Sequence, residues 1–233
     1  MILGALVGIA ILYTIPWDSH LIVIRVWWYR PALVSGISFS SIPLEELIFF
    51  PLQTLFIGIW FVWLVPRVAS RGIAANGGHG VGEDTRSNDR ANMAPLIASV
   101  VGGCLWLVAL LILRLGWRPG TYLGWELVWA LPPLTLQLGL GGDILWTYRR
   151  LVCAVVIPVV VYLSSVDTLA IHEGIWTIDP HQSLGILLGG QLPLEELVFF
   201  SVTTALVVFG LVLGVATESR RRFHRYQAAL RGK

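Results

Sequence analysis

Two short acidic motifs contain the residues of this sequence best suited to chemistry. The run Pro-Leu-Glu-Glu at 43–46 returns 150 residues later at 193–196, and a Phe-containing apolar stretch follows each copy. Two neighbouring carboxyl groups in apolar surroundings can differ in protonation, so that one donates a proton and the other accepts one. The motifs therefore indicate acid–base chemistry at a site poor in water. The candidate acid–base residues are Glu45, Glu46, Glu195 and Glu196.

The helix expected after each motif carries further candidate site residues. Spacings of three, four and seven residues from the second glutamate place two phenylalanines and one polar residue on the same helix face. These residues are Phe49, Phe50 and Gln53 in the first copy, and Phe199, Phe200 and Thr203 in the second. Such a face suits a pocket lining, because ionisable groups at membrane depth face the interior of a bundle. Alternatively, the motif only starts a helix at the membrane interface, where Pro and Glu are favoured in the first turn.

A second acid and an aromatic loop recur upstream of both motifs, at an offset of 149 residues. Asp18 and Asp167 each close an apolar segment, and Trp27 and Trp176 follow in the loops. The two aspartates are candidates either for orienting and recharging the glutamates or only for capping helix ends. Trp17, Trp27 and Trp176 are candidate substrate contacts, although tryptophan and tyrosine also gather at membrane interfaces as an aromatic belt.

The elements that must position these residues are predicted to be membrane-spanning helices. Of the 233 residues, 56% are hydrophobic and 13% charged, whereas soluble domains carry about 25% charged residues. The expected spans are 1–16, 43–65, 94–115, 121–141, 150–166 and 193–216. Because a bilayer core needs about 20 apolar residues per helix, we predict an all-α, polytopic transmembrane bundle of six to seven helices. This bundle is expected to lie in the cell membrane.

The distribution of basic residues predicts the orientation of the bundle. Twelve of the 16 basic residues fall on the face that would receive both termini, the loop after the second span and the turn 142–149. Such a bias marks the cytoplasmic side, so the motif loops 17–42 and 167–192 are expected outside. The arginines flank apolar spans rather than forming a stripe, which argues against a nucleic-acid partner.

Two parallel internal repeats are predicted, because the acidic motifs lie an even number of spans apart. The span 121–141 has no counterpart in the first copy, so the first repeat is expected to lack its first helix. The expected organisation is a first repeat at 1–66, a flexible cytoplasmic loop at 67–93, a linker transmembrane helix at 94–118, a second repeat at 119–217 and a basic cytoplasmic tail at 218–233.

The sequence resembles the membrane lycopene β-cyclases of archaea, fungi and some actinobacteria, over nearly its whole length. The resemblance is carried by Tyr13-Thr14-Ile15-Pro16-Trp17-Asp18, by Val26-Trp27-Trp28-Tyr29 and by Pro43-Leu44-Glu45-Glu46 with Phe49-Phe50. It implies a redox-neutral isomerisation. A proton adds to a linear ψ-end of lycopene, the cation closes a six-membered ring, and loss of a ring proton leaves a β-ionone end. Two such steps lead through γ-carotene to β-carotene.

The expected partners are the carotenoid substrate and membrane lipid, together with a possible homo-oligomer or other carotenoid enzymes. We expect no flavin or nicotinamide, because no Gly-rich phosphate-binding fingerprint follows a strand. We also expect no metal, because His20, His172 and His181 lack the spacing of metal ligands. Three other interpretations stay open, namely a small parallel-repeat transporter with proton-linked acidic pairs, a carotenoid-binding subunit without catalysis, and a cyclase or hydratase of longer carotenoids.

Overall fold

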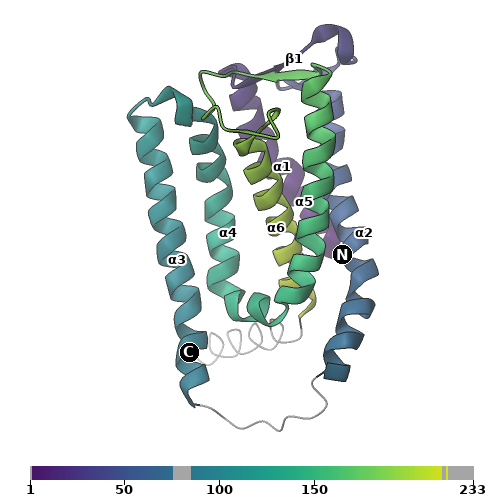
Figure 1. Ribbon diagram of the computed structural model, residues 1–233, viewed down its shortest axis with the longest axis vertical. Helices are drawn as coiled ribbons and strands as arrows, with labels where there is room; N and C mark the ends of the chain where they lie inside the picture. Colours follow the sequence, from purple (N-terminus) through teal and green to yellow (C-terminus); the bar gives the residue numbers. More distant parts are fainter. Residues whose placement is uncertain (1, 76–84, 217–218, 220–233) are drawn as a thin grey trace, which may run out of the picture.

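The protein is an upright bundle of α-helices in the computed structural model, which describes residues 2–75, 85–216 and 219 (Figure 1). Within these residues the α-helices are α1 (Ile2–Val23), α2 (Leu44–Ala75), α3 (Thr85–Arg114), α4 (Thr121–Thr147), α5 (Arg149–His172) and α6 (Leu194–Val215). Short 3₁₀ helices, η1 (Pro31–Leu33) and η2 (Arg118–Gly120), interrupt the connections. The helix α3 lies at one edge of the bundle, with α4 next to it.

Five helices of the described part of the chain are long and apolar enough to cross a membrane. They are Ile2–Val23, Leu44–Val68, Ile97–Arg114, Arg149–His172 and Leu194–Val215. The remaining helix, α4, is not among them, although a sixth span was expected at 121–141. It carries Glu126, two internal prolines and a non-helical backbone at Gly141 (φ −153°, ψ 26°). Because α4 packs against α3 and α6, its polar groups need not contact lipid.

Several helices are longer than the apolar runs that predicted them. The helix α1 continues past Pro16 to Val23, and α5 continues to His172 rather than 166. Asp18 and Asp167 therefore lie inside helices, and the expectation that they cap helix ends is wrong. Residues 67–75 and 85–93 of the expected loop are helical, while 76–84 and the tail, apart from Ser219, lie outside the described residues.

The two motif helices meet through equivalent residues, as a pseudo-two-fold axis requires. The side-chain amide of Gln53 on α2 donates to the hydroxyl of Thr203 on α6 at 3.0 Å, between residues 150 apart in the chain. The outer loops pair in the same way through β1 (Trp27–Tyr29) and β4 (Trp176–Ile178), which are antiparallel. Trp27 is equivalent to Trp176, and Tyr29 to Ile178, at the offset of 149 residues. In the paired strands Trp27 lies opposite Ile178 and Tyr29 opposite Trp176, as expected when a two-fold axis passes between the strands.

A tight hairpin precedes each motif helix and fixes where that helix begins. The hairpins are β2 (Ser38–Phe39) with β3 (Ile42–Pro43), and β5 (Leu187–Leu188) with β6 (Leu192–Pro193). The first helical N–H of each motif donates to the start of its hairpin, Leu44 to the Ile37 carbonyl and Leu194 to the Ile186 carbonyl, both at 2.9 Å. Proline just before the first turn has no N–H of its own that would need a partner there.

The apolar core of the bundle lies between α2, α5 and α6, away from the hairpin end. Ile57, Val155, Val159, Val208 and Val212 are almost completely buried there. A second cluster, built on Trp17, Leu21, Trp27, Tyr122 and Trp129, lies at the hairpin end. Two packed clusters hold α1, α4, α5 and α6 rigidly around the residues between them.

Candidate active site

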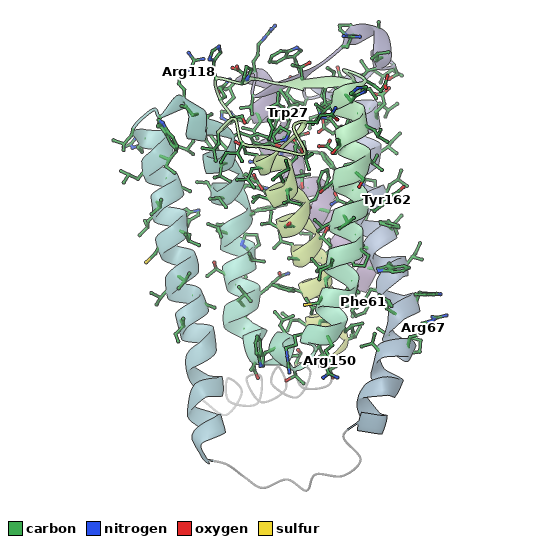
Figure 2. The ribbon with its side chains drawn as sticks, in the orientation of Figure 1. Trp27, Phe61, Arg67, Arg118, Arg150 and Tyr162 are labelled. Carbon is green, nitrogen blue, oxygen red and sulfur yellow. The ribbon has the colours of Figure 1, made fainter. Side chains whose placement is uncertain are left out.

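A cavity of about 270 Å³ lies at the hairpin end of the bundle, close to the paired strands β1 and β4. Figure 2 shows one of its wall residues, Trp27, close to this end. Its acidic walls are Asp18, Glu45, Glu46, Asp167 and Glu196, and its aromatic walls are Trp17, Trp27, Tyr29, Phe49, Phe50, Tyr122, Trp176, Phe199 and Phe200. Aliphatic side chains complete the lining, and no Arg, Lys or His of the described residues is part of it. Carboxyl groups from both halves of the chain therefore share one space without a basic partner.

The second glutamate of each motif faces this cavity and is held by a tyrosine. Tyr122 donates its hydroxyl hydrogen to Oε1 of Glu196 at 2.8 Å, and Tyr29 donates to Oε2 of Glu46. Burial, and then the neighbouring Glu46 carboxyl, raise the pKa of the Tyr29 hydroxyl well above its usual value. Tyr29 therefore remains a hydrogen-bond donor at any pH near neutrality.

The two tyrosines come from different elements, although the glutamates that they hold are equivalent. The residue equivalent to Tyr29 in the second half is Ile178, which has no hydroxyl. Tyr122 of α4 takes that role in the second half, and none of the described residues of the first half forms a helix equivalent to α4. The cavity is thus pseudo-symmetric in its acids and asymmetric in the groups that hold them.

The first glutamate of each motif ties down the loop before it. Oε1 of Glu45 accepts the backbone N–H of Ser35 at 2.6 Å, and Oε1 of Glu195 accepts that of Leu184 at 2.7 Å. Glu45 is exposed at the rim of the cavity, whereas Glu195 is fully buried and is not a lining residue. The structure therefore brings Glu46 and Glu196 together in the cavity and leaves Glu195 outside it.

The two aspartates join the second glutamates in the cavity wall. Asp18 and Asp167 are 1% and 3% exposed, and Oδ2 of each has no hydrogen-bond partner among the described residues. The Asp18 carboxyl lies within hydrogen-bonding reach of the Glu46 carboxyl. Two carboxyl groups can form a hydrogen bond only if one of them carries a proton. The first half of the site thus contains a pair that can share a proton.

Stacked aromatic rings form one wall of the cavity. The ring of Trp17 stacks on Phe199 (centroids 5.8 Å apart, planes at 8°) and on Trp129 (4.6 Å, 20°). The indole N–H of Trp17 donates to the Trp125 carbonyl at 3.0 Å, which fixes the ring. Aromatic faces attract a cation by about 2 kcal/mol or more in a desolvated site, so this wall is suited to a positively charged intermediate.

Comparisons with known proteins agree with these observations. The family described as lycopene cyclase matches residues 2–64 and 121–213. A lycopene beta-cyclase of Halobacterium salinarum is 36% identical over 210 residues, which cover 90% of this chain and 80% of that protein. The chain belongs to the lycopene cyclase family. Bifunctional lycopene cyclase/phytoene synthases of Podospora anserina and Aspergillus oryzae are 35% and 30% identical, over about nine-tenths of this chain and 34% of theirs. No solved structure matches the chain.

The lycopene cyclase family match leaves out 65–120, which contains the whole of α3. The cavity contains side chains of α1, α2, α4, α5 and α6 and none of α3. The matched segments are therefore those that build the site.

Most of the substrate-contact residues predicted from the sequence do line this cavity. They are Trp17, Trp27, Phe49, Phe50, Trp176, Phe199 and Phe200. Gln53 and Thr203 do not line it. They bond to each other and lie in a second cavity further along the bundle. The stripe of residues predicted as one lining is therefore shared between two spaces.

Three residues at or behind the cavity are not among the site residues predicted from the sequence. Tyr29 belongs to the motif that carries the family resemblance but was not predicted as a site residue, and neither were Tyr122 and Glu126. Glu126 lies one helical turn after Tyr122 on α4, is fully buried, and has no hydrogen-bond partner for either carboxyl oxygen among the described residues. An acid within an apolar span is by itself a signal of function, but only the duplicated acids had been selected.

Proposed function

We propose that the protein is a lycopene β-cyclase, which converts the linear ψ-ends of lycopene to β-ionone rings by acid–base catalysis. The observation that carries this proposal is the meeting of Glu46 and Glu196, one from each half, in a single aromatic cavity. Protonation of an alkene requires a carboxylic acid in a site from which water is excluded. An apolar lining with four inward-facing acids suits a hydrocarbon substrate better than a polar solute, which would need hydrogen-bonding groups.

We assign the proton donor to Glu196 and the base to Glu46. Glu196 is only 7% exposed and has the further buried acids Glu195 and Glu126 near it, so a negative charge there has no cationic partner. Glu46 is less buried and lies within reach of two hydrogen-bond donors, Tyr29 and a protonated Asp18. Two environments of this kind separate an acid from a base.

The reaction then balances within the cavity. Glu196 gives its proton to the terminal double bond of the ψ-end and becomes a carboxylate, while a tertiary cation forms. The neighbouring double bond attacks this cation, the new carbon–carbon bond closes the ring, and Glu46 removes a ring proton. No electron is lost or gained overall. Asp18 and Asp167, which line the same cavity, are the groups positioned to return the proton from Glu46 to Glu196.

We further propose that the hairpin end of the bundle faces the outside and that both termini are cytoplasmic. Figure 2 shows Arg67 and Arg150 towards one end of the bundle, with Arg118 and Trp27 towards the other. By their positions in the sequence, most of the basic residues fall in segments expected on the same side as Arg67 and Arg150, which supports this orientation through the positive-inside rule.

Expression in a lycopene-accumulating bacterium tests the proposal directly. Chromatography of the pigment should show β-carotene with the wild-type chain, and lycopene with Glu46→Gln or Glu196→Gln. Glu173→Gln is a matched control, because Glu173 is an exposed loop residue paired only with His172 in the described structure. Immunodetection in the membrane fraction establishes that each variant is inserted. Full conversion by both cavity variants would remove these glutamates from the mechanism, and unchanged lycopene with the inserted wild-type chain would refute the activity.

A further inference from the structure

A second cavity, of about 260 Å³, lies further along the bundle from the acidic one. It is lined by α1, α2, α4 and α6, with Ala10, Leu136 and Val207 among its walls, and none of its lining residues is acidic or basic. Its α1 residues precede Asp18 by up to twelve positions. At 1.5 Å per residue, the far wall lies about 18 Å along the helix from the acids, towards the middle of the membrane-spanning segment.

The two cavities share two walls. Phe50 and Phe199 line both of them, so the spaces meet at these rings. Thr203 lies one helical turn beyond Phe199 and bonds to Gln53 at 3.0 Å, which places the join close to the pseudo-two-fold contact between the halves. A molecule with one end among the acids would pass these rings to extend further.

The polar groups around the second cavity mostly bond within the protein. Tyr13 donates its hydroxyl hydrogen to the Trp129 carbonyl at 2.8 Å, and the Trp129 indole donates back to the Tyr13 carbonyl at 3.2 Å. Thr54 donates to the Phe50 carbonyl and the Gln137 amide nitrogen to the Leu206 carbonyl, both at 3.0 Å, while Oε1 of Gln137 has no partner among the described residues. Groups satisfied in this way gain little from a polar ligand, so the cavity is suited to a hydrocarbon.

The second cavity also borders the lipid-facing surface between α1 and α4. Ile9 and Leu136, which belong to its walls, are 60% and 61% exposed. Tyr13 and Trp129 stack on each other with centroids 5.7 Å apart and join α1 to α4 on the side nearer the acids. The space beyond this contact is therefore accessible to a molecule dissolved in the bilayer.

We propose that the second cavity binds the polyene chain of the carotenoid whose linear end lies among the acids, and that the chain enters from the bilayer between α1 and α4. This inference rests on the proposed function. Pockets for drug-sized ligands enclose roughly 300–1,000 Å³, and each cavity alone falls below that range. The two together fall within it, so the space beyond Phe50 and Phe199 supplies the volume that the rest of the chain needs when its reacting end lies among the acids.

Filling the second cavity tests this proposal without changing an acid. Ala10→Phe on α1 and Val207→Phe on α6 each place a ring in the cavity from opposite walls. Ala5→Phe and Val215→Phe are matched controls on the same helices, because Ala5 and Val215 are exposed and line neither cavity. The purified proteins in lipid nanodiscs are assayed with lycopene and with a truncated linear polyene that keeps the same end group but lacks most of the chain.

We expect each filling variant to raise KM for lycopene at least about tenfold, equivalent to about 1.4 kcal/mol of binding free energy. KM for the truncated polyene should stay within about twofold, and both controls should match the wild type with both substrates. If the filling variants handle lycopene like the wild type, the cavity holds only acyl chains of membrane lipid, and the proposal is overturned. An equal loss with both substrates in both variants also overturns it, because the predicted selectivity is absent. Wild-type protein that converts neither substrate would instead refute the proposed function.

Discussion

Replacing Tyr122 by Phe should slow the cyclase by about one to two orders of magnitude while leaving substrate binding intact. The hydroxyl of Tyr122 is the hydrogen-bond donor to Glu196, at 2.8 Å, and both side chains are buried. If Glu196 gives up its proton in the reaction, this bond is strengthened as the carboxylate forms. The ring itself packs against Trp27, with centroids 5.3 Å apart, and Phe preserves that contact.

The magnitude follows from the strength of a hydrogen bond to a charged group. Such a bond contributes about 1.5–3 kcal/mol in a protein, and each 1.36 kcal/mol of barrier is a factor of ten in rate. Tyr122→Phe should therefore lower kcat by about 10- to 150-fold. Because the hydroxyl bonds to the acid and is not needed to hold a hydrocarbon, KM should change by less than about threefold. The same loss then appears in kcat/KM.

Tyr29→Phe is the matched comparison, since Tyr29 donates to Glu46 in the other half. A carboxylate that loses a hydrogen bond becomes a stronger base. Removal of the ring proton by Glu46 should therefore not be slowed, and any fall in kcat should be less than about threefold. Initial rates of product formation in nanodiscs, measured by chromatography over a range of lycopene concentrations, separate kcat from KM. An unchanged kcat in Tyr122→Phe refutes the role of Glu196 as donor. If kcat falls strongly only in Tyr29→Phe, then Glu46 is the proton donor and Glu196 the base.

Three further predictions concern residues outside the reacting pair. Glu126→Leu should raise the thermal unfolding midpoint in detergent, because an apolar side chain replaces a buried carboxyl that has no hydrogen-bond partner among the described residues. A lower midpoint would show that the Glu126 carboxyl stabilises the fold. Ser41→Gly should raise the midpoint by relieving a left-handed backbone (φ 73°), worth about 1–2 kcal/mol, and Gly190→Ser at the equivalent position (φ 78°) should lower it. A fall with Ser41→Gly would contradict this reasoning. Asp179→Asn should lower the midpoint at pH 7 only. Hydrogen bonds from the Gln182 side chain and the His181 backbone lower the pKa of Asp179. The ionised Asp179 carboxylate therefore stabilises the fold at pH values above 3.8, the usual pKa of an aspartate. This stabilisation is lost as the pH falls through and below that value. An equal decrease below about pH 3 would refute this.

The helices and the convergence of the two motifs could be predicted from the sequence, because both depend on local and repeated features. Long apolar runs have to be helical in lipid, and a duplicated motif an even number of spans apart has to lie on the same side of the membrane. Helix ends were less predictable. Asp18 stops an apolar run without stopping α1, because a buried acid in a protein cavity need not contact lipid.

The different positions of the paired glutamates could have been anticipated from helix geometry. Adjacent residues on an α-helix point about 100° apart, since a turn contains 3.6 residues, so Glu46 can face the interior of the cavity while Glu45 lies exposed at its rim. Gln53 lies seven residues beyond Glu46, about 10 Å along the axis, which places it past the end of that cavity. The predicted helix face does point inward, but it is longer than one cavity, so Gln53 lines the second cavity instead of the first.

The role of α4 could not be predicted from the repeat, because no equivalent of α4 lies among the described residues of the first half. Tyr122 reaches Glu196 only because α4 packs against α6, and no periodicity within 121–147 specifies that neighbour. A residue contributed by tertiary packing alone leaves no pattern in a single sequence. Glu126 was recognisable in the sequence as an acid in an apolar segment. It is not duplicated, however, and only duplicated acids were taken as candidate site residues.

The duplicated architecture brings the second glutamate of each motif into one cavity, which supports a single reaction site rather than two. If each half had its own site, the second glutamates would line separate cavities, but Glu46 and Glu196 line the same one. The second cavity has no acid in its lining, so it cannot protonate an alkene. A symmetric substrate with two ψ-ends must therefore present its ends to the acids one after the other. Because only one of the two cavities is lined by acids, and we propose that the rest of the chain occupies the other, the second cyclisation requires the monocyclic product to leave the cavity, turn and enter again. The two halves thus resemble each other because each contributes one glutamate to the pair Glu46 and Glu196. The tyrosines that bond to these glutamates come from different elements, Tyr29 from β1 and Tyr122 from α4, so the two glutamates have different surroundings.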